Sequence, residues 1–223
     1  MRFIGNILKW LVILFLGFVI LIIMEFPAIF VTPSPSNATV KFNFWHNVSL
    51  VIGFAILSFI LEYLVCWWAG NKINFFKKIS FKKLILAISS GIALYIVETL
   101  MTMNMKGGTG ETSLYGQTMR TSLCIPLWIT IAVITPTLEE LFFQGLIQKG
   151  ILKFLNPWVS MIITAVFFGV MHAMSFSLIF FVHWISGMVL AYVYYKTDDI
   201  KVPIITHGMF NLILLIQTGM QFL

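Results

Sequence analysis

Long apolar runs separated by short polar stretches dominate the hydrophobic pattern of this chain. A helix that crosses a bilayer needs about 20 consecutive, mostly apolar residues. Runs of about this length predict seven spans, at residues 7–30, 47–69, 84–105, 122–148, 157–175, 176–195 and 202–222. A very short turn joins the fifth and sixth spans, which predicts a tight helical hairpin. We therefore expect an all-α fold, a polytopic transmembrane bundle of about seven helices.

The composition agrees with this picture. Of 223 residues, 60% are hydrophobic and 10% are charged, whereas a soluble domain has about a quarter charged residues. The first run, Ile7 to Val31, is longer than the apolar core of a signal peptide, and no A-x-A-like cleavage site follows it, so we expect a retained helix. Cys66 and Cys124 lie inside apolar runs and form no disulfide framework. The sequence therefore predicts a multi-pass protein of the cell membrane.

The positions of the Lys and Arg residues predict the orientation in the membrane. With a cytoplasmic N-terminus, the outer loops contain three of these residues, Lys41, Lys106 and Arg120. The cytoplasmic segments contain eleven: Arg2, Lys9, Lys72, Lys77, Lys78, Lys82, Lys83, Lys149, Lys153, Lys196 and Lys201. This asymmetry predicts a cytoplasmic N-terminus and membrane lipid as a partner. Nucleic acid is not expected as a partner, because the Lys residues lie between hydrophobic runs rather than on one soluble face.

Acidic residues inside predicted spans require an explanation, because each costs at least about 2.5–3.5 kcal/mol near a helix centre. Glu62 and Glu98 are single acids, for which a hydrogen bond to a neighbouring helix is the preferred interpretation. Glu139 and Glu140 are adjacent and follow Pro136, which removes a backbone hydrogen bond, kinks the helix and frees a carbonyl. We therefore expect the functional site at this pair.

The spacing around the pair suits general acid–base chemistry. Adjacent helical residues differ by about 100° in direction, so Glu139 and Glu140 should face different partners. Gln144 lies four residues after Glu140, on the same face, and can form a hydrogen bond with it. Two neighbouring carboxylates in a low dielectric do not both ionise readily, so one can hold a proton while the other accepts one.

Histidines on the following spans complete the candidate site. Phe168 and His172 end the fifth span, and His207 and Asn211 lie four residues apart on one face of the last span. A helical rise of about 1.5 Å per residue puts His172 roughly 20 Å from the cytoplasmic end, against about 15 Å for Glu139. We expect a shared polar site in spite of this difference. For His183, on the sixth span, a structural role is the preferred interpretation.

These residues resemble the CPBP family of intramembrane proteases, the CAAX-processing and bacteriocin-processing enzymes also called the Abi family. The family motifs are Glu-Glu-x-x-x-Arg, Phe-x-x-x-His and His-x-x-x-Asn or Asp, on successive helices. They correspond here to Glu139-Glu140 with Gln144, Phe168 with His172, and His207 with Asn211. Gln144 stands where the motif has Arg. The resemblance covers about residues 122–215.

The resemblance implies two parts of the chain, residues 1–121 with three transmembrane helices and residues 122–223 with the catalytic core. It implies an endopeptidase, without a cofactor, for a membrane-associated peptide or protein. Glu139, helped by His172, would take a proton from the attacking water. His207 and Asn211 would donate hydrogen bonds to the oxyanion, and Glu140 would orient the site with Gln144.

Three alternatives remain open from the sequence. Glu139, His172 and His207 can supply three ligands to zinc, which predicts a zinc-dependent membrane protease. A non-catalytic bacteriocin-immunity protein can keep the fold, and Gln144 favours this alternative. A proton-coupled transporter can use the same side chains, but the repeated halves or paired broken helices typical of transporters are not found in the sequence.

Overall fold

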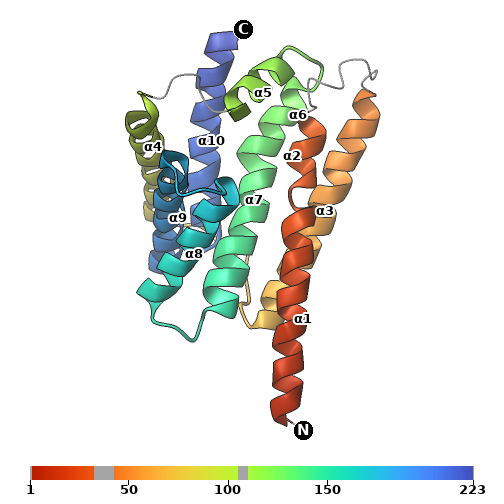
Figure 1. The fold of residues 1–223 in the computed structure, drawn as a ribbon, viewed down its shortest axis with the longest axis vertical. Coiled ribbons are helices and arrows are strands. Elements are labelled where there is room, and N and C mark those ends of the chain that lie inside the picture. The colour runs from red at the N-terminus through yellow and green to blue at the C-terminus, as the bar shows by residue number, and fades with distance from the viewer. Residues whose placement is uncertain (1, 33–42, 105–109, 223) are drawn as a thin grey trace.

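The structure is a computed structural model that describes residues 2–32, 43–104 and 110–222, with the side chains of residues 7–32, 43–104 and 113–222. All regular elements in these residues are helices, packed as a bundle whose termini lie at opposite ends (Figure 1). The all-α fold expected from the sequence is confirmed. Lys41, Lys106 and the side chain of Arg2, which entered the predicted orientation, lie outside the described residues.

The N-terminal half contains two long helices that follow a broken first one. Its elements are α1 (Arg2–Ile23), α2 (Phe26–Val31), α3 (Phe44–Ala69), α4 (Phe81–Thr102) and α5 (Gly110–Met119). The chain leaves the helical path at Met24 and Glu25, just before Pro27, which lies in the first turn of α2. Proline has no backbone N–H and is tolerated in a first helical turn, so the break falls immediately before it.

The C-terminal half consists of one long helix followed by three others. The long helix contains α6 (Cys124–Ile129), the π-helical segment η2 (Thr130–Ile134), α7 (Thr135–Glu140) and the π-helical segment η3 (Leu141–Ile151). It is followed by α8 (Pro157–His172), α9 (Leu178–Thr197) and α10 (Lys201–Phe222). Polar side chains cap two of these helices, since Asn156 accepts from the N–H of Trp158 and Ser177 from that of Phe180.

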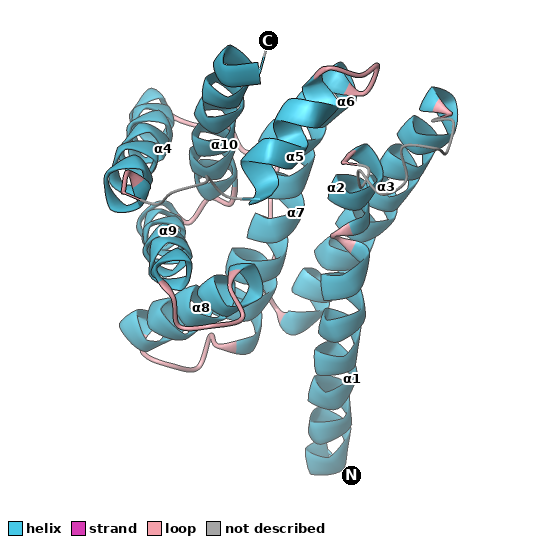
Figure 2. Ribbon diagram, turned by 45° about the horizontal axis from the view of Figure 1, so that its top comes forward, coloured by secondary structure: helices cyan, strands magenta, loops and turns pink. Residues whose placement is uncertain are grey.

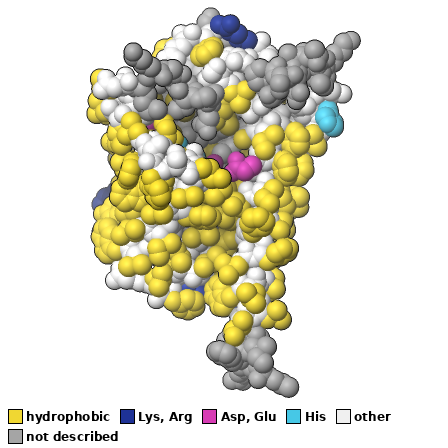
Figure 3. Space-filling view, in the orientation of Figure 1, with side chains coloured by type: hydrophobic (Ala, Val, Ile, Leu, Met, Phe, Trp, Pro, Cys, Tyr) yellow, Lys and Arg dark blue, Asp and Glu magenta, His cyan; other side chains and the backbone are white. Residues whose placement is uncertain are grey.

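Six helices of the described chain are long and apolar enough to cross a membrane. They cover residues 7–31, 44–69, 81–102, 124–151, 178–197 and 201–222, and match six of the seven expected spans. The fifth expected span, residues 157–175, is instead the 16-residue helix α8, which ends part of the way up the bundle (Figure 1). Apolar side chains cover the sides of the bundle, as expected for contact with lipid (Figure 3).

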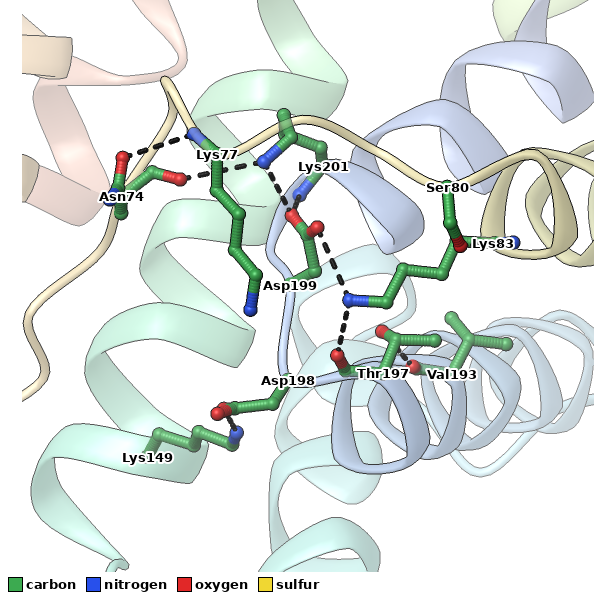
Figure 4. Close-up of polar contacts among 10 residues, drawn as sticks. All are labelled: Asn74, Lys77, Ser80, Lys83, Lys149, Val193, Thr197, Asp198, Asp199 and Lys201. Carbon is green, nitrogen blue, oxygen red and sulfur yellow. Dashed lines mark hydrogen bonds and ion pairs between the residues drawn. The ribbon is translucent and has the colours of Figure 1, made fainter.

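A cluster of ion pairs joins four elements at the end of the bundle where α9 meets α10 (Figure 4). Lys83 donates to the carbonyl oxygen of Thr197 at 2.7 Å and to Asp199 at 3.4 Å. Lys201 pairs with Asp199 at 2.7 Å, and Lys149 pairs with Asp198. We call this the Lys-rich end. Its contacts connect α4, η3, α9 and α10, which carry or adjoin the candidate site.

Replacing Asp199 by Asn is expected to destabilise the bundle by about 1–3 kcal/mol, because the change removes the charge that two lysines contact. Burial alone would raise the pKa of Asp199, but the hydrogen bond from Lys201 and the charges of Lys201 and Lys83 outweigh it, so this pKa lies below its ordinary value. A carboxyl group whose pKa is lowered by folding stabilises the folded protein at pH values above its ordinary pKa of about 3.9. This contribution is lost as the pH falls through the lowered pKa.

The free energies of unfolding of wild type and Asp199→Asn should therefore differ by a constant amount between about pH 5 and 8, and converge below about pH 4. Unfolding in detergent, followed by circular dichroism at several pH values, measures this difference. Asp198→Asn is the matched control, since its side chain is 80% exposed and such pairs contribute at most about 1 kcal/mol. Equal effects of the two variants would contradict the prediction.

Candidate active site

A cavity of about 400 Å³ lies inside the bundle and brings both halves of the chain together. Polar and aromatic side chains of the C-terminal helices form one wall: Glu139, Phe143, Phe168, His172, His183, Ser186, His207 and Asn211. Residues of the N-terminal half also line the cavity: Met24, Glu25, Ala28, Leu94, Glu98 and Tyr115. Acidic side chains are visible in the middle of the otherwise apolar face (Figure 3). The site is thus polar, at mid-height, and surrounded by apolar surface.

Glu140 and His207 form a buried pair at the base of this site. His207 Nδ1 lies 2.9 Å from Glu140 Oε1, and the Glu140 side chain is fully buried. A carboxylate accepts here, so the imidazole Nδ1–H is the donor. This bond fixes the orientation of the ring and leaves Nε2 directed toward Glu139.

Glu139 faces two histidines. Its Oε2 lies 3.8 Å from His172 Nε2 and 3.9 Å from His207 Nε2. Both distances exceed a direct hydrogen bond, but one water molecule that lies beside the two groups can form a hydrogen bond with each. Glu139 thus faces both histidines, whereas Glu140 contacts the other side of His207, as their 100° difference in direction predicts. Glu139 Oε2 and the two Nε2 atoms surround a space suited to a small polar reactant.

His172 is held by its own helix. Its Nδ1 lies 2.8 Å from the carbonyl oxygen of Phe168, so a neutral ring donates from Nδ1 and presents the lone pair of Nε2 to the site. Its ring also stacks on Phe168 at 4.3 Å and on His183 at 4.4 Å between centroids. The difference in depth expected from a straight helix does not arise, because α8 is inclined to α7 (Figure 1 and Figure 2).

Asn211 reaches a backbone carbonyl that Pro136 leaves without its helical donor. In the π-helical pattern of η2, an N–H bonds the carbonyl five residues earlier, as the N–H of Thr135 does to Thr130. Pro136 lacks the N–H that would bond Ile131, and Asn211 Nδ2 donates to the Ile131 oxygen instead, at 2.9 Å. The freed carbonyl expected from the sequence thus fixes Asn211. An amide has two N–H groups, so one remains for another acceptor.

Gly208, between His207 and Asn211, lets α10 approach this same kink. A Cβ atom placed on Gly208 would lie 2.5 Å from the carbonyl oxygen of Ala132. Ala132 precedes Pro136 by four residues, and its oxygen is the one that an α-helical bond from residue 136 would use. The kink and the glycine together set the separation of α7 and α10, and with it the contact between Glu140 and His207.

Gln144 lies beside Glu140 and is fully buried, as its spacing predicts. Its amide oxygen and nitrogen nevertheless make no hydrogen bond of good geometry with the residues that the structure describes, and neither does Glu140 Oε2. The two side chains are therefore neighbours, as expected, but they form no hydrogen bond of good geometry.

The structure adds residues that sequence reasoning did not assign to the site. Glu25 lies in the cavity wall at the break between α1 and α2, and the acid one residue before Phe26-Pro27 in an apolar run is the signal that points to it. Glu98 and His183, for which a structural role was preferred, also line the cavity. Glu62 is fully buried outside this lining, and neither of its carboxyl oxygens finds a hydrogen-bond partner in the described chain.

Metal binding has no further support from the geometry. In residues 2–32, 43–104 and 110–222, no group of three or more His, Cys, Asp and Glu side chains is arranged to hold a metal ion. The proposed zinc ligands Glu139, His172 and His207 do lie around one space. The choice between a metal-free site and a zinc site therefore belongs to experiment.

Comparison with known proteins connects this geometry to a family. Residues 121–213 match the family model described as "Type II CAAX prenyl endopeptidase Rce1-like". A Bacillus subtilis (strain 168) protein named "Putative membrane peptidase YdiL" is 31% identical over 94 residues, which are 42% of this chain and 38% of that protein. No solved structure matches. The matched range contains every motif residue from Glu139 to Asn211, so the part of the chain that carries the candidate site is similar to these membrane peptidases.

Proposed function

We propose that this protein is an intramembrane endopeptidase that hydrolyses a peptide bond of a membrane-associated peptide or protein with a water molecule activated by Glu139. One observation carries the proposal: Glu139 Oε2 lies 3.8 Å from His172 Nε2 and 3.9 Å from His207 Nε2, inside a cavity at mid-height of the bundle. Groups this close can both hydrogen-bond one water molecule that lies beside them, which is the arrangement that general-base hydrolysis uses.

In the first step, water donates one hydrogen bond to Glu139 and one to the lone pair of His172 Nε2. Glu139 takes a proton as the water oxygen bonds to the scissile carbonyl carbon, and the carbonyl oxygen becomes an oxyanion. Protonated His207 donates from Nε2, and Asn211 donates from its second N–H, to this oxyanion. The proton on Glu139 then passes to the amide nitrogen as the C–N bond breaks, which leaves an acid and an amine.

Glu140 has the supporting role. Its carboxylate is paired with His207 Nδ1 at 2.9 Å, so it favours the protonated ring that stabilises the oxyanion. Where the family motif has Arg, Gln144 is neutral and supplies no charge to Glu140. His207 is therefore the group that pairs with the Glu140 carboxyl in place of an Arg.

The substrate reaches the site from the membrane. Apolar side chains surround the bundle, and the cavity combines an apolar outer region (Met24, Ala28, Leu94) with the polar reacting groups. The same proposal includes a metal-free reaction, a cytoplasmic N-terminus and contact of the Lys-rich end with anionic lipid. Nine Lys residues lie in the helix ends and connecting segments there: Lys72, Lys77, Lys78, Lys82, Lys83, Lys149, Lys153, Lys196 and Lys201. The termini at opposite ends then put the C-terminus outside (Figure 1).

A non-catalytic immunity role is the second candidate. The observation that favours it is Gln144, whose amide forms no hydrogen bond of good geometry in the described chain although the motif has a charged Arg there. In that case the Glu140–His207 pair would only stabilise the bundle.

Cleavage of peptides by the purified protein in nanodiscs tests the proposal. The panel contains a prenylated C-terminal peptide, its unprenylated form and a single-span apolar peptide, each with and without a strong chelator, and mass spectrometry identifies the products. We expect cleavage that survives chelation, because Glu139 activates water without a metal. Loss on chelation with recovery on adding zinc would contradict the metal-free mechanism, and cleavage of no peptide would favour the immunity role.

A further inference from the structure

A row of buried polar side chains runs from the site toward the Lys-rich end. Glu140, Gln144 and Gln148 follow one another at intervals of four residues, so they lie on one side of the long helix. Glu140 and Gln144 are fully buried and Gln148 is 4% exposed. Gln148 lies three residues before η3 ends at Ile151. The row thus connects the catalytic pair with the end of the helix.

Helix α8 contributes a matching pair of hydroxyls. Ser160 Oγ donates to the carbonyl oxygen of Gln148 at 3.0 Å, which puts Ser160 at the level of Gln148. α8 runs back along η3, so Thr164, one turn after Ser160, lies at the level of Gln144. Phe168 follows after another turn and contacts Phe143 beside the site, at 4.9 Å between ring centroids. Ser160 and Thr164 therefore face Gln148 and Gln144 from the neighbouring helix. We call Glu140, Gln144, Gln148, Ser160 and Thr164 the polar row.

Most of the polar side-chain atoms in the row can form further hydrogen bonds. Glu140 Oε2, both polar atoms of Gln144, Gln148 Oε1 and Thr164 Oγ1 are buried without a hydrogen bond to any described residue. The only bond of the Gln148 amide in the described chain is from Nε2 to the carbonyl oxygen of Ala191, at 3.1 Å. Buried polar groups of native proteins are nearly always satisfied, and ordered water is the usual partner when protein groups are not.

We propose that the polar row binds a file of ordered water molecules that supplies the site from the Lys-rich end. The unpartnered atoms include donors and acceptors, the two to four partners that a buried water needs. They follow one another along the row at about one helical turn, a separation that one or two bridging waters span. The proposal extends the proposed function, because each hydrolysis consumes one water at a site surrounded by lipid.

The neutral glutamine at position 144 fits this role. An Arg at this position would fill the space beside Glu140 with a guanidinium that pairs with the carboxylate directly. With the shorter amide, the carboxylate atom Oε2 has no hydrogen bond to any described residue, and the amide adds donors and an acceptor to the row. Gln144 in place of Arg thus gives a hydrated site where the family motif has a charge pair.

Radiolytic labelling with X-rays tests the row without requiring peptidase activity. Radicals formed from bound water oxidise side chains beside it, and methionine reacts readily. Met161, next to Ser160, is fully buried, and Met119, in a separate apolar cluster with Leu127 and Leu215, is 3% exposed. In wild-type protein in nanodiscs, we expect several-fold more oxidation at Met161 than at Met119. Equal oxidation of the two methionines would overturn the proposal.

Variants of the polar row test whether water bound there causes the oxidation of Met161. Thr164→Val keeps the shape of the side chain and removes a hydroxyl, and Gln144→Leu removes both amide atoms. Each should bring oxidation of Met161 close to that of Met119, and each should lower kcat of an active enzyme with little change in KM. The matched control is Thr118→Val, because the buried Thr118 hydroxyl already donates to the Leu114 carbonyl, at 2.9 Å.

Every result bears on the proposal. If Gln144→Leu does not fold, Thr164→Val alone decides, and unchanged labelling of Met161 in that variant would overturn the row as the source of the radicals. Strong labelling of Met161 in a protein that cleaves no peptide would support the water file and count against the proposed peptidase. Peptide cleavage without strong labelling of Met161 would support the proposed peptidase and overturn the water file.

Discussion

Glu139→Gln is expected to reduce kcat for peptide cleavage by about 10²–10⁴-fold, the range that a positioned general base contributes. The amide has nearly the same shape and can still accept one hydrogen bond, but it cannot take a proton from water. The distances of 3.8 and 3.9 Å to the two histidines need not change. KM should therefore stay near the wild-type value, so the loss appears in kcat. Steady-state kinetics in nanodiscs measures both constants.

Glu62→Gln is the matched control for this experiment. Glu62 is a fully buried glutamate of a membrane span, and it interacts electrostatically with Glu139 but does not line the cavity. The same chemical change there should leave kcat within a few-fold of wild type. If Glu139→Gln retained most of the activity, or if Glu62→Gln lost as much, Glu139 would not be the base.

Gly208→Ala is expected to reduce both stability and activity. Its new methyl group would lie 2.5 Å from the Ala132 carbonyl oxygen, which is backbone and cannot rotate away. Overpacking of this kind costs about 1–3 kcal/mol, against a gain of about 1 kcal/mol from replacing glycine by alanine in a helix. The strain can be relieved only if α10 moves away from α7. His207 and Asn211 lie on either side of Gly208, and a displacement of about 1 Å can cost about 100-fold in rate.

Gly53→Ala is the control for Gly208→Ala, because a Cβ atom at Gly53 meets no atom within 4 Å. This variant of α3 gains helix propensity without strain, so it should be at least as stable as wild type and fully active. Unfolding by a denaturing detergent and the peptide assay measure the two effects. A Gly208→Ala protein as stable and active as Gly53→Ala would contradict the close approach of the helices.

Hydropathy alone predicted most of the architecture. Six spans were located to within a few residues, since a membrane helix requires a long apolar run and little else in the sequence produces one. The early end of α8 at His172 was not predicted, because the apolar residues after His172 continue the run. The break at Glu25 was missed for a similar reason: the flanking segments are apolar on both sides, although Pro27 marks the position.

The site was predicted as a set of residues but not as a geometry. Helical spacing correctly separated the directions of Glu139 and Glu140 and put His207 and Asn211 on one face. It could not show that Asn211 donates to Ile131, because that bond depends on the π-helical register before Pro136. It also could not show that His183 stacks on His172, since this contact depends on how α8 and α9 pack.

The short helix α8 has a consequence for the bilayer itself. At about 1.5 Å per residue, its 16 residues span roughly 24 Å, against a hydrocarbon thickness of about 30 Å. The turn that follows it exposes Met174 and Phe176 part of the way up the bundle, beside His172. Lipid next to this hydrophobic mismatch is expected to thin locally. A substrate helix that diffuses into the thinned zone would be too long for it, and would tilt or unwind one end, which gives an extended peptide bond just where the site opens.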